Sequence, residues 1–273
     1  MRDYSISPRA IFTSLLVNRQ LIKTLVRREI SQRYRGSMLG VLWSFLNPVF
    51  MLAVYTFVFS VVFKARWGAS ESGSRAEFAL VLFAGMLVFN LFAECISRCP
   101  TLILSNTTYV KKVVFPLEIL PWVCLGSALF NAGVGLIVWL LFSLFVFGLP
   151  PATILLLPII ILPLLLFIMG LSWLLSSLGV FLQDVSQVVG IVITALMFLT
   201  PIFYPASAIP KSYQVYIYLN PLTFIVEQTR NLIIYGQGVS WVGYGFVTIL
   251  SATVSWLGFA WFQKTRKGFA DVL

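Results

Sequence analysis

No charged side chain occurs between Glu118 and Asp184. A helix needs about 20 apolar residues to cross the ~30 Å hydrocarbon core of a bilayer, because each residue rises ~1.5 Å. The uncharged stretch is about three times that length, and only the turn-forming residues 148–151 (GLPP) interrupt it. Within lipid, the helix itself must satisfy the backbone hydrogen bonds. The stretch therefore predicts two membrane-spanning helices joined by a tight hairpin.

The composition of the whole chain indicates the same class of protein. Of its 273 residues, 59% are hydrophobic and only 10% are charged, whereas about 25% of residues are charged in a soluble domain. The sequence shows no linker, low-complexity tract or repeat, so residues 1–273 are expected to form a single transmembrane domain of the all-α integral membrane class. The N-terminal segment is basic and lacks the compact apolar core of a cleavable signal peptide.

Hydrophobic patterning predicts six spanning helices, preceded by an amphipathic helix in the membrane interface. Apolar residues recur at helical spacing across a basic segment at about 9–35, which is typical of an interfacial helix. Residues 201–240 are too apolar for an ordinary loop, but their prolines leave only short pieces. We therefore expect short re-entrant helices before the last span. The predicted spans are about 37–63, 78–96, 119–147, 152–181, 185–204 and 241–262.

The distribution of lysine and arginine predicts how these spans are oriented. With both termini in the cytoplasm, the inner segments carry 14 of the 19 basic residues and the outer segments carry five, among them Arg230. Basic residues are enriched on the cytoplasmic side of membrane proteins, so six spans with both termini cytoplasmic are favoured. The net charge of +10 then reflects cytoplasmic-side residues and contact with anionic membrane lipids, and no nucleic-acid partner is expected.

The sequence lacks the motifs of enzymes and ion-coupled carriers. It has no histidine, no acidic pair within a span and no glycine-rich phosphate loop, so no catalytic residue, metal site or bound cofactor is expected. Cys95 and Cys99 are a conceivable metal pair, but without a histidine we interpret them and Cys124 as packing residues. These absences disfavour a membrane-embedded glycolipid enzyme. A secondary transporter is also disfavoured, because Glu94 and Asp184 fall near predicted span ends.

Three segments in a fixed order carry a resemblance to a known family. They are residues 33–48 (RYRGSMLGVLWSFLNP), 109–121 (YVKKVVFPLEILP) and 220–224 (NPLTF). Together, within six spans, they resemble the permease subunits of type-2 ABC exporters that move polysaccharides: O-antigen, capsular polysaccharide and, more distantly, teichoic acid. The resemblance covers essentially the whole chain.

The resemblance implies a function and a set of partners. The chain would be a multi-pass permease of the bacterial inner membrane, acting as a homodimer with two copies of a separate ATPase that binds the ATP and Mg. Its substrate would be a polysaccharide linked to polyprenyl diphosphate and exported from the cytoplasm. A type-2 ABC exporter of teichoic acid, drugs or lipids stays open, because only the basic N-terminal helix and the aromatic first span favour polysaccharide.

A short cytoplasmic segment is similar to the family's coupling helix, which docks into the ATPase subunit. The residues that would make this contact are Tyr109, Lys111, Lys112, Phe115 and Glu118. A short segment with a basic pair and an apolar knob, ended by a proline, suits the transmission of a rigid push. Without the resemblance, the same residues would be interpreted as an ordinary positive-inside loop that sets topology.

Two arginines stand where the interfacial helix turns into the first span. The resemblance implies that Arg33 and Arg35 lie near the cytosolic entrance for the lipid-linked glycan, and the planar fork of arginine suits a diphosphate. Charge alone would instead assign both residues to topology and to the binding of anionic lipid. Asp184 departs from the family pattern, because Gln183 stands where a basic neighbour is expected, and any role for it is in doubt.

Aromatic side chains are abundant, and sugar rings pack their C–H faces on aromatic planes. Aromatic residues of the first and fifth spans are therefore candidates for lining a glycan channel, although most aromatics in membrane proteins form interfacial belts or pack in the core. The candidates are Trp43, Phe50, Tyr55, Phe198, Phe203 and Tyr204.

Overall fold

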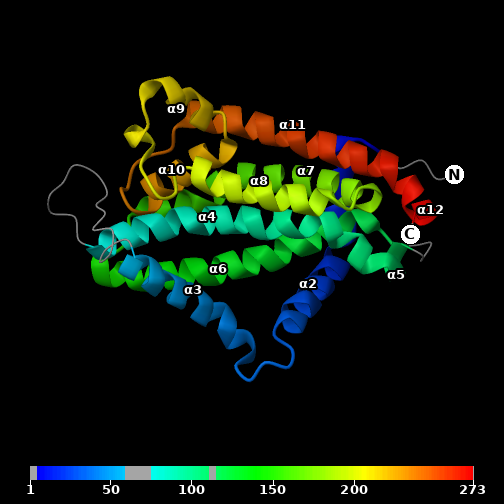
Figure 1. Cartoon of the computed structure of the whole chain (residues 1–273), viewed down its shortest axis with the longest axis horizontal. Coiled ribbons are helices and arrows are strands. Elements are labelled where there is room, and N and C mark those ends of the chain that lie inside the picture. The colour runs from blue at the N-terminus through cyan, green and yellow to red at the C-terminus, as the bar shows by residue number, and fades with distance from the viewer. Residues whose placement is uncertain (1–4, 59–74, 111–114, 273) are drawn as a thin grey trace.

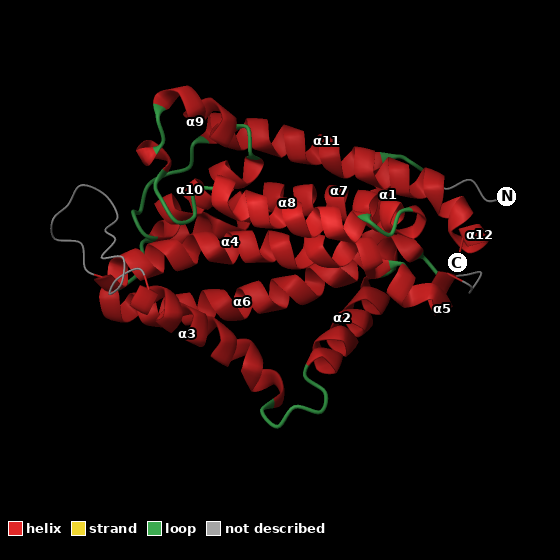
Figure 2. Ribbon diagram, viewed as in Figure 1, coloured by secondary structure: helices red, strands yellow, loops and turns green. Residues whose placement is uncertain are grey.

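The computed structural model describes residues 5–58, 75–110 and 115–272, and within these ranges it consists of helices without any strand (Figure 1, Figure 2). The all-helical class predicted from the sequence is confirmed. The main bundle contains α3 (Trp43–Tyr55), α4 (Arg75–Leu102), α6 (Leu120–Val146), α7 (Leu157–Phe181), α8 (Val185–Leu199) and α11 (Trp241–Thr265). Short 3-10 segments lie at Gly40–Leu42, Leu104–Asn106, Leu117–Ile119, Ala152–Leu156, Ala206–Ala208 and Arg266–Gly268.

Five stretches of the described chain are long and apolar enough to cross a membrane. They are Gly40–Val58, Ala76–Leu102, Leu117–Val146, Ala152–Phe181 and Trp241–Gly268. Helix α4 is the central one: every side chain from Phe78 to Ala84 is buried, and the helix packs against α6, α7, α8 and α10 (Pro221–Ile233). Figure 1 shows α4 running between α8 and α6 along the long axis of the molecule.

The fifth predicted span, 185–204, is shorter than expected. Helix α8 has 15 residues and ends at Leu199, so it rises only about 22 Å, less than the ~30 Å hydrocarbon core. Thr200 adopts an extended conformation (φ −83°, ψ 137°), as is usual for a residue that precedes a proline. Five of the six predicted spans therefore coincide with helices that are long and apolar enough to cross a membrane.

The second span is longer than the predicted range 78–96. Helix α4 continues past residue 96 to Leu102, so that Glu94 and Arg98 lie within the helix. Both charged side chains have ion-pair partners on α2 (Arg19–Arg33), and this pairing offsets the cost of placing charges in an apolar helix.

The interfacial helix predicted at about 9–35 consists of two helices. Asn18 (φ −97°, ψ 12°) separates α1 (Pro8–Val17) from α2, and its side chain donates to the Ser14 carbonyl at 2.9 Å. Helix α2 packs directly on α6, where a Cβ atom on Gly126 would lie 2.7 Å from the Val26 side chain. The N-terminal helices are thus fixed to the bundle and do not lie apart from it.

The two ends of the bundle carry different elements. At one end lie α5 (Thr107–Val110) and α12 (Phe269–Val272), while α9 (Lys211–Tyr218) and α10 lie at the other (Figure 1). Asn220 caps α10 by accepting the Leu222 N–H at 3.0 Å, and Pro221 occupies the first turn, where its missing N–H has no cost. The short helices predicted between residues 201 and 240 are therefore present.

Candidate functional site

A large cleft lies between α2, α3 and the rest of the bundle. Figure 1 shows α2 and α3 leaning away from the bundle as the two arms of a V. The volume of the cleft is about 720 Å³, and side chains from α2, α3, α4, α6 and α8 line it. One end of the cleft is charged and its middle is polar but uncharged. Aromatic side chains from α3 and α4 complete the wall.

The charged end of the cleft is an ion pair between α2 and α4. Arg33, the last residue of α2, donates from Nη2 to Oε1 of Glu94 at 2.6 Å. Asn131 of α6 donates its amide to both oxygens of the same carboxylate, at 2.8 and 3.0 Å. A second ion pair, between Arg98 and Glu29, ties the same two helices together. The Glu94 carboxylate therefore holds Arg33 at the mouth of the cleft.

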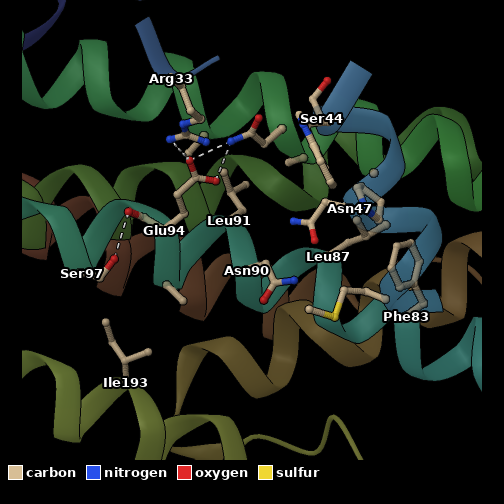
Figure 3. Close-up of a pocket in the computed structure, with 18 of the residues that line it drawn as sticks. Arg33, Ser44, Asn47, Phe83, Leu87, Asn90, Leu91, Glu94, Ser97 and Ile193 are labelled. Carbon is tan, nitrogen blue, oxygen red and sulfur yellow. Dashed lines mark hydrogen bonds and ion pairs between the residues drawn. The ribbon is translucent and has the colours of Figure 1, made fainter. Parts of the chain in front are cut away.

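The middle of the cleft combines amide groups with aromatic rings. Asn90 lies near the middle of α4, and Asn47 faces it from α3 (Figure 3). Trp43 and Tyr55, two of the aromatic residues predicted to line a channel, border the same space together with Phe83. Three of the sequence-predicted residues, Arg33, Trp43 and Tyr55, thus meet in one cleft.

The other predicted residues lie outside the lining of this cleft. Arg35 is exposed, beyond the end of α2, and Phe50 faces away with 67% of its surface exposed. At the end of α8, Phe198 packs against Phe203 with ring centroids 5.9 Å apart, and the Tyr204 hydroxyl donates to the Phe198 carbonyl at 2.7 Å. These last three residues form an aromatic cluster that closes the break after α8.

The two described ends of the segment predicted to couple to an ATPase contact each other. Tyr109 of α5 stacks on Phe115 with ring centroids 4.2 Å apart and an angle of 6° between the planes. Both rings are half-buried, and Arg28 of α2 reaches the Tyr109 hydroxyl at 3.5 Å. Lys111 and Lys112 lie outside the residues that the structure describes. The stack fixes the two ends of the segment relative to each other.

One arginine connects this segment to the C-terminal end of the chain. Arg266, directly after α11, donates to the Glu118 carboxylate at 2.5 Å and to the Phe115 carbonyl at 2.9 Å. The side chains of Arg266 and Glu118 are only 9% and 15% exposed. Glu118, predicted to contact an ATPase, is instead largely enclosed by this internal pair in the structure.

The residues of the cleft and of the coupling segment lie within one family match. Residues 20–234 match the profile of the family described as ABC-2 type transporter. The chain belongs to the ABC-2 type transporter family. The matched range begins in α2 and ends just after α10, so this ABC-2 transporter shares with its family the whole region that builds the cleft.

Named relatives of this ABC-2 transporter align over almost their full length. The O-antigen export system permease protein RfbA of Klebsiella pneumoniae is 27% identical over 260 residues, which cover 93% of this chain and 95% of the relative. RfbA of Myxococcus xanthus is also 27% identical, with the same coverage. The polysialic acid transport protein KpsM of Escherichia coli is 23% identical and covers 92% of this chain and 95% of its own length.

Arg230 of this ABC-2 transporter has a structural role that the sequence pattern did not predict. Arg230, counted above as an outer-loop charge, is 3% exposed within α10. Its guanidinium donates to the carbonyls of Val81, Pro201 and Ile202 at 3.0, 2.6 and 2.6 Å. It thereby joins α10, α4 and the break after α8. An arginine within a strongly apolar segment was the available signal, because such a charge is rarely free.

The three cysteines are buried between α4 and α6. Cys99 donates its thiol to the Cys95 carbonyl at 3.0 Å, and Cys124 approaches the same carbonyl from α6. Among the described residues, no group of three histidine, cysteine or acidic side chains is placed to hold a metal ion.

Proposed function

We propose that the chain is the membrane subunit of an ATP-driven exporter that carries a polysaccharide of the O-antigen or capsule type across the bacterial inner membrane. The observation that supports this most strongly is the nearly full-length match to permeases named for O-antigen export and polysialic acid transport. The cleft is consistent with such a cargo, because it joins a charged end to a wall of amides and aromatic rings.

The proposed topology has six crossings with both termini in the cytoplasm. Helix α8 is short, but together with the residues that follow it α8 would provide the one crossing that the five long stretches do not supply. Helices α9 and α10 would re-enter the membrane from outside. Support comes from the concentration of basic residues in the segments predicted to be cytoplasmic. The location of α9 and α10 at the end of the bundle opposite α5 and α12 also supports it (Figure 1).

This topology can be tested with single cysteines in a chain whose three buried cysteines are replaced by alanine. Leu149, which is 89% exposed in the turn between α6 and α7, should react as cysteine with an impermeant thiol reagent added to whole cells. Gln183, exposed between α7 and α8, should react only after the membrane is made permeable. The opposite pattern would overturn the proposed orientation.

The charged end of the cleft is the proposed entrance for the polyprenyl diphosphate that carries the glycan. Arg33 lies at the mouth of the cleft, and Arg35 is exposed nearby on the turn that leads to α3. The planar guanidinium groups of both arginines can bind a diphosphate through paired hydrogen bonds. Since Glu94 already accepts from Arg33 at 2.6 Å, the arriving diphosphate would compete with this carboxylate for the guanidinium.

The proposed assembly is a homodimer of this chain with two copies of a separate ATPase, which would hold the ATP and Mg. The coupling contact is assigned to Tyr109, Lys111, Lys112 and Phe115, with Glu118 holding the segment in place. A push on the Tyr109–Phe115 stack would reach α2 through Arg28 and α11 through Arg266. The segment is thus linked both to the helix that carries Arg33 and to the last span.

Deletion and complementation in the native host test the proposal. Loss of the gene should abolish surface polysaccharide while lipid-linked polysaccharide accumulates in the cytoplasm, and the intact chain should restore export. Normal surface polysaccharide in the deletion strain, together with loss of another exported lipid or polymer, would assign the transporter to a different substrate.

A further inference from the structure

Two asparagines in the middle of the cleft have no hydrogen-bond partner in the described part of the chain. Asn47 of α3 and Asn90 of α4 both line the cleft, and both side chains are exposed. Figure 3 shows the amides of Asn47 and Asn90 directed into the same space. Asn131, by contrast, donates its amide to Glu94. The free amides are therefore a feature of the cleft and not of the packed core.

The positions of Asn47 and Asn90 within candidate membrane spans would make their free amides costly in contact with lipid. Asn90 lies near the middle of α4, a helix long enough to span the bilayer, and Asn47 lies within the first candidate span. An amide that faces hydrocarbon without a partner costs several kcal/mol, by order of magnitude. A lipid-facing position would favour leucine, so the two asparagines indicate that a polar phase fills the cleft.

The helix backbone beside Asn47 is also irregular. Pro48 lies inside α3 and has no N–H, so the Ser44 carbonyl, four residues earlier, lacks its usual helical donor. Ser44 and Pro48 both line the cleft. The polar groups of Asn47, Asn90 and Ser44 that line this part of the cleft are all uncharged.

We infer that Asn47 and Asn90 form a subsite that binds the hydroxyl groups of uncharged sugar residues as the glycan passes through the cleft. This inference rests on the proposed function. A side-chain amide offers two N–H donors and a carbonyl acceptor, so it can either donate a hydrogen bond to a hydroxyl or accept one from it. Trp43 and Tyr55 of the same cleft supply apolar faces for the sugar rings. The charged end of the cleft, at Arg33 and Glu94, would then bind the anionic carrier lipid, and the two asparagines would bind the uncharged sugar chain.

Export by leucine and glutamine variants tests the subsite. N47L/N90L removes both amides without adding a charge, and surface glycan at equal membrane level should fall about tenfold, as expected for the loss of two neutral hydrogen bonds. N47Q/N90Q keeps the amides and should retain most of the export. The matched control is T253V, which removes a polar group from the exposed face of α11, where the hydroxyl bonds only its own helix. Normal export by N47L/N90L would overturn the inference.

A second measurement reports on the cleft without relying on export. In the cysteine-free chain, N47C and N90C should react with a charged methanethiosulfonate in isolated membranes. Reaction only with a membrane-soluble maleimide would show that the positions face lipid and would overturn the inference. So would an efficient disulfide between the N47C residues of two copies that leaves export intact, because the asparagines would then seal an interface. If deletion of the gene leaves surface glycan unchanged, the proposed function itself fails, which is a different result from normal export by N47L/N90L.

Discussion

Arg266 donates to the Glu118 carboxylate at 2.5 Å, and this pair joins the end of the last span to the segment that precedes α6. The same guanidinium holds the Phe115 carbonyl at 2.9 Å. Phe115 stacks on Tyr109, so the position of the coupling segment depends on Arg266, which lies 151 residues after Phe115 in the sequence. Arg266, directly after the last span, is therefore part of the proposed coupling region.

Removal of this pair should weaken both the fold and the coupling. R266A leaves a largely enclosed carboxylate without its partner, and we expect a loss of about 2 kcal/mol in the free energy of unfolding, less than for a fully buried pair. Export per ATP hydrolysed should fall as well. K264A removes a charge from an exposed residue close by and should change neither quantity. Thermal unfolding in detergent and coupled ATPase assays provide the measurements, and equal behaviour of both variants would contradict the role of Arg266.

The Tyr109–Phe115 stack gives a sharper test of the coupling segment. F115D replaces a half-buried ring with a charge and should uncouple ATP hydrolysis from export while the protein still inserts into the membrane. F115Y keeps the aromatic plane and should behave like the parent chain. Unchanged export and ATPase rates for F115D in proteoliposomes would show that the segment does not contact the ATPase.

The proposed entrance predicts that lysine cannot replace arginine. Topology and attraction of anionic lipid need only positive charge, whereas paired hydrogen bonds to a diphosphate need the planar fork. R33K/R35K should therefore reduce surface glycan at equal membrane level while assembly with the ATPase persists. K23R provides a matched control on the exposed face of α2 and should be silent. Normal export by R33K/R35K would contradict binding of the diphosphate by these arginines and would show that their positive charge alone is needed.

The space around Arg230 predicts the effect of a single methyl group. A Cβ atom on Gly85 would lie 2.5 Å from Nη2 of Arg230, so G85A must displace the guanidinium from its carbonyl acceptors. We expect a loss of about 2–4 kcal/mol, because a buried charged donor would lose hydrogen bonds. At Gly133 of α6 a Cβ atom meets nothing within 4 Å, and G133A should leave stability unchanged or slightly higher. Unfolding temperatures in detergent compare the two variants directly.

Local sequence signals predicted some features of this chain and not others. The long uncharged stretch predicted α6 and α7 with nearly correct bounds, since hydropathy alone determines which helices can lie in lipid. The extension of α4 past residue 96 was missed, because it contains the charged Arg98, whose partner Glu29 lies 69 residues away in the sequence. The burial of Arg230 was missed for the same reason, as its acceptors lie 149, 29 and 28 residues away.

The candidate site shows the same division. Arg33 and Trp43 were found because they lie near the start of the first span, and Tyr55 because it is an aromatic residue within that span; charge and aromatic content are visible in the sequence. Asn90 and Asn131 were not found, since a single asparagine in an apolar helix carries no pattern. Their relation to Asn47 exists only once α3, α4 and α6 are brought together.

The most direct test of polysaccharide export is ATP-dependent transport in inverted membrane vesicles that contain this chain, its ATPase and the lipid-linked glycan. The cytoplasmic face of such vesicles points outward, so exported glycan moves into the lumen, away from an added lectin. The account predicts that ATP lowers the lectin-accessible glycan and that F115D abolishes this loss. Lectin binding that stays constant with ATP, in vesicles whose ATPase is active, would contradict it.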